Sequence, residues 1–255
     1  MNFGLIEQTL LNKIKKDRCI HLSLIDPEGT KPSDAVNLAK DLEQYGTAAI
    51  MVGGSTIAST SLVDEVILAL KNSIKIPVIL FPNNVAGVSK HADAMWFMSL
   101  LNSNNPLYIT GFQALAAPTI KRFGIEAIPL AYIIVGTEST AAYVGQAHII
   151  PYNAVEIATS YALAAEYLGM RFIYLEAGSG AKKPVSSKMV NMVKKNVSIP
   201  VIVGGGIKDR SSAKILANAG ADAIVTGTVL ENNKSRRRIK EIIMSIKDVN
   251  DNKIE

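Results

Sequence analysis

The chain has 255 residues, of which 48% are hydrophobic and 19% are charged, and its formal net charge is +5. That length allows one large α/β domain or two small ones. No apolar run reaches membrane-spanning length, and residues 1–18 lack the apolar block and cleavage site of a secretory signal. The one cysteine, Cys19, excludes an internal disulfide and argues against a cysteine-based metal site. We therefore expect a cytoplasmic protein.

Apolar runs rich in β-branched residues recur along the chain. In chain order they are CIHLSLID (19–26), AAIMVGG (48–54), PVILFP (77–82), AMWFMSL (94–100), EAIPLAYII (126–134), RFIYLEAG (171–178), PVIVGGG (200–206) and ADAIVTG (221–227). Their nearly continuous hydrophobicity is typical of parallel strands that are buried on both faces. Most are separated by amphipathic helical stretches, so the sequence predicts an α/β protein, a single (β/α)8 TIM-barrel domain over residues 1–255.

The predicted helices carry their own end signals. A glycine just before a strand is the residue expected to end a helix in the left-handed conformation. Four glycines stand at such positions: Gly46, Gly124, Gly169 and Gly220.

The two halves of the chain resemble each other. Shifted by 123 residues, IPVI (76–79) falls on IPVI (199–202), whereas ADA (92–94) matches ADA (221–223) only at a shift of 129. The first half is thus shorter between its third and fourth strands. Because residues 83–91 are too few for a full helix with its loops, we expect a shortened connection there and a thinly covered barrel wall.

Glycines follow the seventh and eighth predicted strands, as GGG (204–206) and GT (227–228). In this fold functional groups gather at the carboxyl ends of the strands, and these two ends often bind phosphate. Without a Cβ, glycine lets backbone N–H groups approach phosphate oxygens, and the following helix adds its dipole. The pattern predicts a phosphate site; the alternative is that these glycines only form tight turns.

A carboxylate follows the first predicted strand in LIDPEG (24–29). At that position Asp26 can ligate a metal, act as a general base or cap the next helix. The second strand ends in GGST (53–56), which offers the hydroxyl of Ser55. A carboxylate and a hydroxyl, with diphosphate oxygens and water completing an octahedron, suit Mg²⁺.

A second carboxylate ends the sixth predicted strand, in YLEAGSGAKKP (174–184). Glu176 is expected to point into the barrel mouth, with Tyr174 on the same side of the strand. A buried carboxylate near a bound alcohol could accept its proton. The alternative is that Glu176 forms an ion pair with Lys182 or Lys183.

Other features carry weaker signals. His21 lies within a strand, where a satisfied interior residue is the expected role. Trp96 is expected in the core or beside an apolar groove. The basic run KSRRRIK (234–240) is typical of a solvated helix face, or of attraction to an anionic membrane surface or to phosphorylated substrates. Aromatic residues are sparse and not interleaved with the basic ones, so nucleic acid is not expected as a partner.

Several motifs together resemble one family. They are LIDPEG, MVGGST, FPNN, FMSLLNSNNP, YLEAGSGA, VGGGI and VTGTVLE, and in this order they look like geranylgeranylglyceryl phosphate synthase, over residues 19–231. The related heptaprenylglyceryl phosphate synthases share the pattern. Some members carry a lysine two residues before the first-strand aspartate; this chain has Leu24, which fits a different subgroup.

The resemblance implies a Mg²⁺-dependent prenyltransferase with a modified TIM barrel. Such an enzyme joins sn-glycerol 1-phosphate to geranylgeranyl diphosphate, the first ether of archaeal-type membrane lipids. By motif match, Asp26 and Ser55 would hold Mg²⁺, and Glu176 would orient or deprotonate the attacking hydroxyl. The glycerol phosphate would be bound by Tyr174, Leu175, Glu176, Ala177, Gly178, Ser179, Gly180, Gly205, Gly206, Gly227 and Thr228. The family resemblance also suggests a dimer or higher homo-oligomer.

Two other functions share part of this pattern. A sugar-phosphate isomerase or cyclase would use the same glycine loops, but it would need a second acid at the end of the fifth strand, where the sequence offers only Glu138, beyond the strand. A catalytically silent phosphate- or phospholipid-binding barrel would use residues 234–240 at a membrane surface.

Overall fold

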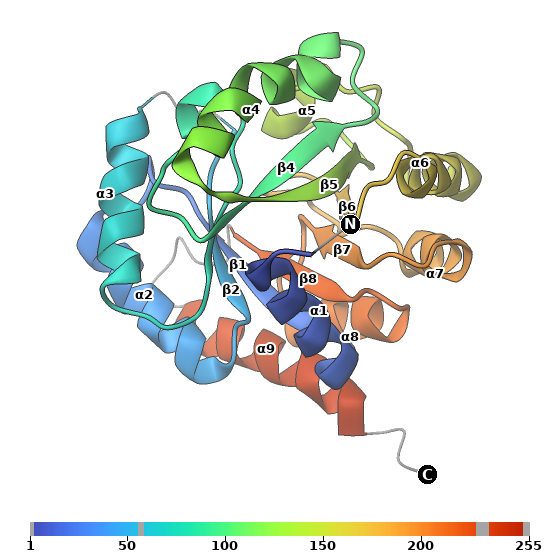
Figure 1. Ribbon diagram of the computed structural model, residues 1–255. Helices are drawn as coiled ribbons and strands as arrows, with labels where there is room; N and C mark the ends of the chain where they lie inside the picture. The colour runs from blue at the N-terminus through green and yellow to red at the C-terminus, as the bar shows by residue number, and fades with distance from the viewer. Residues whose placement is uncertain (1–2, 56–58, 228–234, 252–255) are drawn as a thin grey trace.

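The computed structural model describes residues 3–55, 59–227 and 235–251. Eight parallel strands close into a barrel in which each strand pairs with the next along the chain and the last pairs with the first (Figure 1). The strands are β1 (Ile20–Ile25), β2 (Ala49–Val52), β3 (Val78–Leu80), β4 (Ala94–Leu100), β5 (Glu126–Ile134), β6 (Phe172–Glu176), β7 (Val201–Gly204) and β8 (Ala223–Thr226). The predicted TIM barrel and all eight predicted strands are confirmed.

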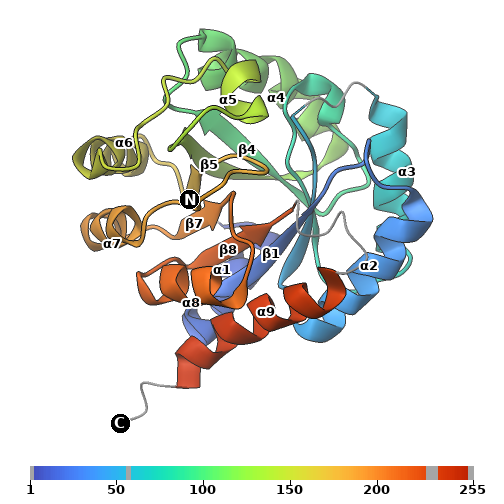
Figure 2. The ribbon, with the colours of Figure 1, turned by 180° about the vertical axis from the view of Figure 1, so that it is seen from behind.

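Helices surround the barrel, as Figure 2 shows from the opposite side. They are α1 (Leu5–Asp17), α2 (Pro32–Tyr45), α3 (Thr60–Lys71), α4 (Phe112–Phe123), α5 (Thr140–Val144), α6 (Val155–Tyr167), α7 (Ser187–Asn196), α8 (Arg210–Asn218) and α9 (Ser235–Asp251). The four predicted helix-ending glycines all have positive φ. Among the described residues, no helix combines the length and the apolar character needed to span a bilayer.

Strand side chains alternate between two cores. Outward-facing residues pack beneath the helices, and inward-facing residues such as Met51, Trp96 and Phe172 fill the barrel. His21 is an interior residue, as predicted: its ring nitrogens lie 2.9 Å from the hydroxyls of Thr47 and Thr226. Burial lowers the pKa of His21 to about 3, so the ring is neutral near pH 7.

The expected short connection between the third and fourth strands is present. A single 3₁₀ turn, η1 (Val85–Gly87), takes the place of a full helix between β3 and β4. Strand β3 has three residues, and its register with β4 consists of two pairs, Ile79 with Ala94 and Leu80 with Met95. The barrel wall is therefore thin at this point, and α4 reaches across to η1.

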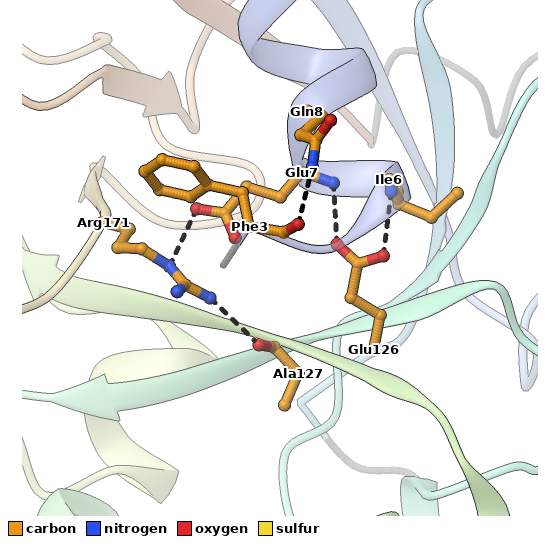
Figure 3. A network of polar contacts seen from close by, with 7 residues as sticks. All are labelled: Phe3, Ile6, Glu7, Gln8, Glu126, Ala127 and Arg171. Carbon is orange, nitrogen blue, oxygen red and sulfur yellow. Dashed lines mark hydrogen bonds and ion pairs between the residues drawn. The ribbon is translucent and has the colours of Figure 1, made fainter. Parts of the chain in front are cut away.

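Helix α1 covers the amino-terminal end of the barrel. Its Leu10 is buried among the interior side chains. The carboxylate of Glu126, the first residue of β5, accepts hydrogen bonds of 2.8 Å from the N–H groups of Ile6 and Glu7 (Figure 3). These two donors belong to the first turn of α1, where N–H groups have no partner within the helix. A residue 120 positions away thus supplies the helix cap.

A buried ion pair holds the same helix. Glu7 is completely buried, and its carboxylate lies 2.8 Å from the Nε atom of Arg171 (Figure 3). The Arg171 guanidinium also lies 5.5 Å from the centre of the Phe3 ring. Burial raises the pKa of Glu7, and the charge of Arg171 opposes that rise.

Removing the charge of Arg171 should destabilise the protein. In Arg171→Met the Glu7 carboxylate stays buried without its cation, which typically costs about 3 kcal/mol or more of the free energy of unfolding. The pKa of Glu7 in the folded state would rise further above its unfolded value. The loss should therefore be largest near neutral pH and diminish as the pH falls and Glu7 takes up a proton.

Urea denaturation at about pH 7 and about pH 5 measures this loss. The control is Arg122→Met, which removes an exposed arginine from α4. A loss for Arg171→Met within about 0.5 kcal/mol of that control, the usual range of surface substitutions, would contradict the role given to the ion pair.

Candidate active site

A cavity of about 450 Å³ opens at the carboxyl ends of the strands. Its lining has three parts. The first comprises the glycine-bearing ends of β6, β7 and β8, the second comprises the ends of β2 and β3 beside β1, and the third is apolar and lies under α4 and α5. Glu176 lines the cavity where these parts meet, and it is 6% exposed.

Three donors converge on the Glu176 carboxylate. The N–H of Gly178 donates to its Oε1 atom, and the hydroxyls of Tyr132 and Tyr174 hydrogen-bond to the same group. Tyr174 lies two residues earlier on β6, so it faces the same side, as predicted. Tyr132 is paired with Tyr174 in the register of β5 and β6, and the two ring centroids are 5.2 Å apart.

The electrostatics of this group follow from its burial. Desolvation raises the pKa of Glu176, although the bonds from Tyr174, Gly178 and Tyr132 act in the opposite direction. Burial and the neighbouring carboxylate raise the pKa of both tyrosines well above 10. The phenols therefore stay neutral and can donate to Glu176, and the pKa of the Glu176 carboxyl lies above its ordinary value. Among the described ion pairs, none joins Glu176 to Lys182 or Lys183.

The residues predicted to bind phosphate, where the structure describes them, lie close together at one side of the cavity. Ser179 and Gly180 after β6, Gly205 and Gly206 after β7, and Gly227 after β8 line the same part of the cavity. A Cβ on Gly205 would lie 2.4 Å from Glu176 Oε1 and 2.6 Å from the Gly178 nitrogen, so only glycine fits between these loops. Gly205 and Gly206 also have positive φ, of 80° and 69°.

Some predicted residues have a different placement. Leu175 and Ala177 are fully buried in the core beneath the helices, so only their backbone can reach the barrel mouth. The Gly178 N–H is directed to Glu176 rather than to a ligand. Thr228 lies outside the described residues.

The proposed metal ligands are neighbours at the ends of β1 and β2. A Cβ on Gly54 would lie 2.7 Å from Asp26 Oδ2, and Ser55 follows Gly54 in the cavity lining. Asp26 Oδ1 accepts a 3.0 Å bond from the Glu28 N–H, which fixes the carboxylate. In the described ranges no three acidic, histidine or cysteine side chains gather around one point. This oxygen donor pair fits Mg²⁺ only if a ligand supplies most of the coordination.

The third part of the lining is apolar and continues from the tyrosines to the thin wall. It is formed by Trp96, Phe97, Met98, Leu100, Tyr108, Phe112, Ala116, Ala141 and Val144. Trp96 is thus both core and cavity wall, since its ring is 1% exposed and stacks edge-on against Phe172.

Sequence reasoning missed three residues of this cavity. Tyr132 lies inside an apolar run, and its role follows from the strand register. Lys208 comes two positions after the last glycine of the loop that follows β7, and a cation beside a glycine loop was a usable signal. Arg238 belongs to the basic run 234–240, from which no single residue could be selected.

The fold and the site define a TIM-barrel enzyme with glycine loops of the phosphate-binding type beside a buried carboxyl group. The model of the PcrB family matches residues 12–246. A protein of Thermofilum pendens, named geranylgeranylglyceryl phosphate synthase, is 48% identical over 96% of both chains. A protein of Pyrococcus horikoshii with the same name is 48% identical over 97% of both chains. The chain therefore belongs to the PcrB family.

A solved structure supports this assignment. It is the (S)-3-O-geranylgeranylglyceryl phosphate synthase from Thermoplasma acidophilum in complex with its substrate sn-glycerol-1-phosphate. The two chains share 42% identity and superpose with a TM-score of 0.92, over 97% of this chain and all of the other. The family resemblance read from the sequence is confirmed, and the isomerase and silent-barrel alternatives are not favoured.

A methyl group at Gly205 should disrupt the phosphate side. In Gly205→Ala the new Cβ collides with Glu176 and the Gly178 backbone, and alanine is also strained at φ +80°. The matched control is Gly169→Ala, with φ +84° and open space around the added Cβ. Both variants should lose about 1–2 kcal/mol of stability through backbone strain.

Only Gly205→Ala should also weaken binding of inorganic phosphate, by about tenfold, which corresponds to roughly 1.4 kcal/mol. Isothermal titration calorimetry measures this affinity. Equal phosphate affinity in the two variants would contradict a phosphate site at the ends of β6 and β7.

Proposed function

We propose that this chain is a Mg²⁺-dependent prenyltransferase that joins sn-glycerol 1-phosphate to geranylgeranyl diphosphate through an ether bond. The carrying observation is that one cavity combines glycine loops, a buried carboxylate and a long apolar arm. Each part suits one feature of the two substrates: the phosphate, the attacking hydroxyl and the prenyl chain. The names of the relatives support a geranylgeranylglyceryl phosphate product, and the solved relative is a complex with sn-glycerol-1-phosphate.

The acceptor is held by its phosphate. The loops after β6, β7 and β8 offer backbone N–H groups without side chains in the way, and the loop after β7 also carries Lys208. With the phosphate fixed there, a hydroxyl of the glycerol can lie beside Glu176. Fixing both ends of the acceptor turns a bimolecular collision into a positioned attack.

Glu176 receives the proton of that hydroxyl. The new bond forms between the hydroxyl oxygen and the first carbon of the prenyl chain, while the bond from this carbon to the diphosphate oxygen breaks. The proton moves to Glu176, and the diphosphate leaves with the bonding electrons. A carboxylate whose pKa is raised by burial is a stronger base for this transfer.

The donor's diphosphate is placed at the ends of β1 and β2. There Asp26 and Ser55 would hold Mg²⁺, which when bound offsets the negative charge that grows on the leaving diphosphate. Asn83 donates a 2.9 Å bond to the Ser55 carbonyl, which keeps this loop in position. The prenyl chain lies in the apolar arm, where Trp96, Phe97 and Phe112 exclude water from the allylic carbon.

Three further expectations concern partners and location. A dimer or higher assembly is supported by exposed apolar residues on α6 (Ile157 and Tyr167) and directly after it (Leu168). A cytoplasmic location and a peripheral membrane contact through the basic run stay predictions. Such a contact would suit a product that carries a long apolar chain.

Incubation with labelled sn-glycerol 1-phosphate, Mg²⁺ and prenyl diphosphates of several lengths tests the function. Ether product with the geranylgeranyl donor is the expected result. A clear preference for the heptaprenyl donor would reassign the chain length, and the absence of product with every donor would contradict the proposal.

Asp26→Asn should abolish transfer while binding of glycerol phosphate persists. The substitution keeps the size of the side chain but removes the charge that would hold Mg²⁺. The expected fall in kcat/KM is at least about a hundredfold, which is the typical effect of losing one electrostatic contact to the transition state. Asp34→Asn on α2 is the matched control. Activity close to the wild-type rate would refute the metal assignment.

Tyr132→Phe should shift the acid limb of the pH–rate profile. The phenol hydroxyl stabilises the charged form of Glu176, so its removal raises the pKa of that carboxyl. A base must be deprotonated to act, and activity is lost as the pH falls through that pKa. The acid limb of the plot of kcat/KM against pH should therefore move to higher pH. Tyr143→Phe, at an exposed position on α5, should leave the profile unchanged.

A further inference from the structure

Four basic residues lie near the start of α9, and three of them have a partner on the protein. Arg236 pairs with Asp41 at 3.1 Å, Arg237 pairs with Glu241 at 3.0 Å, and Lys240 lies 5.5 Å from the ring centre of Tyr45. Arg238 forms no ion pair or hydrogen bond with any residue in the described ranges, and it lines the cavity. The four residues are all exposed, as expected of a solvated helix face, but they differ in their partners.

The position of each residue around the axis of α9 explains why Arg238 lines the cavity and Arg237 does not. Arg238 precedes Ile242 by four residues, which puts both on the same face of α9. Ile242 is completely buried against the barrel, as is Ile239 one position after Arg238. Arg237 is rotated by about 100° around the helix axis from Arg238, and its side chain is 91% exposed. Arg238 is itself solvent-exposed, and it lines the open mouth of the cavity at the carboxyl ends of the strands.

The location is unfavourable for an arginine without an anion. The first turn of α9 contains no acidic residue, and cations near a helix N-terminus are repelled by the helix dipole. A phosphate-type anion in the adjoining cavity would offset that repulsion.

The described part of the cavity lining contains two cationic side chains, Lys208 and Arg238, and they lie on different elements. Lys208 follows the glycine loop of β7, on the side assigned to the acceptor phosphate. Arg238 comes from α9, which packs between α8 and α2 and against β1. The first turns of α9 lie beside α2, because Arg236 pairs with Asp41 and Lys240 lies over the ring of Tyr45, and β1, which leads into α2, ends directly before Asp26. Arg238 is therefore on the side assigned to the diphosphate.

We propose that Arg238 binds the diphosphate of the prenyl donor and stabilises it as the leaving group. This inference rests on the proposed prenyltransferase function. A guanidinium can donate two parallel hydrogen bonds to phosphate oxygens, and it keeps its charge throughout the reaction. Arg238 thereby complements Mg²⁺, which Asp26 and Ser55 would hold on the same anion.

The test is direct titration of inorganic pyrophosphate, with and without Mg²⁺, into wild type, Arg238→Gln and Arg238→Lys. The matched control is Arg237→Gln, which removes the neighbouring exposed charge. Loss of a charged hydrogen bond should weaken pyrophosphate binding by Arg238→Gln about tenfold or more, with lysine restoring part of it. The affinity for glycerol phosphate should stay within about twofold. In steady-state assays KM for the prenyl diphosphate should rise more than KM for glycerol phosphate.

Three results would overturn the inference. The first is that Arg238→Gln binds pyrophosphate as tightly as the Arg237→Gln control, and the second is that Arg238→Gln loses more affinity for glycerol phosphate than for pyrophosphate. The third is that Lys208→Gln loses as much affinity for pyrophosphate as Arg238→Gln, which would indicate a general effect of positive charge. Failure of the proposed function is distinguishable. Wild type that binds pyrophosphate through Arg238 but forms no ether would refute the reaction while the site persisted. Wild type that neither binds pyrophosphate nor forms ether would refute both.

Discussion

Glu176 places a carboxyl group in the mouth of the barrel, where its side chain is almost entirely removed from water. A carboxylate in such surroundings is costly unless donors surround it. Tyr174 is supplied by its own strand, Tyr132 by the neighbouring strand, and the N–H of Gly178 by a left-handed turn just after the strand. Gly205 then has to lack a side chain, because its Cβ would occupy the place of the carboxylate. The glycine pattern of the mouth is thus partly a consequence of one buried charge.

The fold could be predicted because its signals are local. Each strand is a short run of apolar residues, and each helix carries its own face pattern and stop residue, as Gly46 and Gly124 illustrate. The short connection after β3 could be inferred because the two halves of the chain can be compared with each other. These features need no knowledge of which strand lies beside which.

The parts of the site that escaped prediction depend on contacts between distant segments. Tyr132 reads as one more apolar residue until the closed barrel pairs it with Tyr174, 42 positions later. Arg238 differs from Arg237 only by the rotation of a helix that docks against the barrel. Leu175 belongs to the motif YLEAGSGA, but strand alternation directs its side chain into the outer core.

The two-pair register between β3 and β4 makes this junction the least cross-linked part of the barrel wall. Few backbone hydrogen bonds have to break there before the strands separate locally. The apolar arm runs along the same junction, bounded by β4, η2 (Leu107–Gly111) and α4. The width of the apolar arm can therefore change with the thickness of the bound chain. The other strand pairs, and the charged groups that they position, keep their geometry.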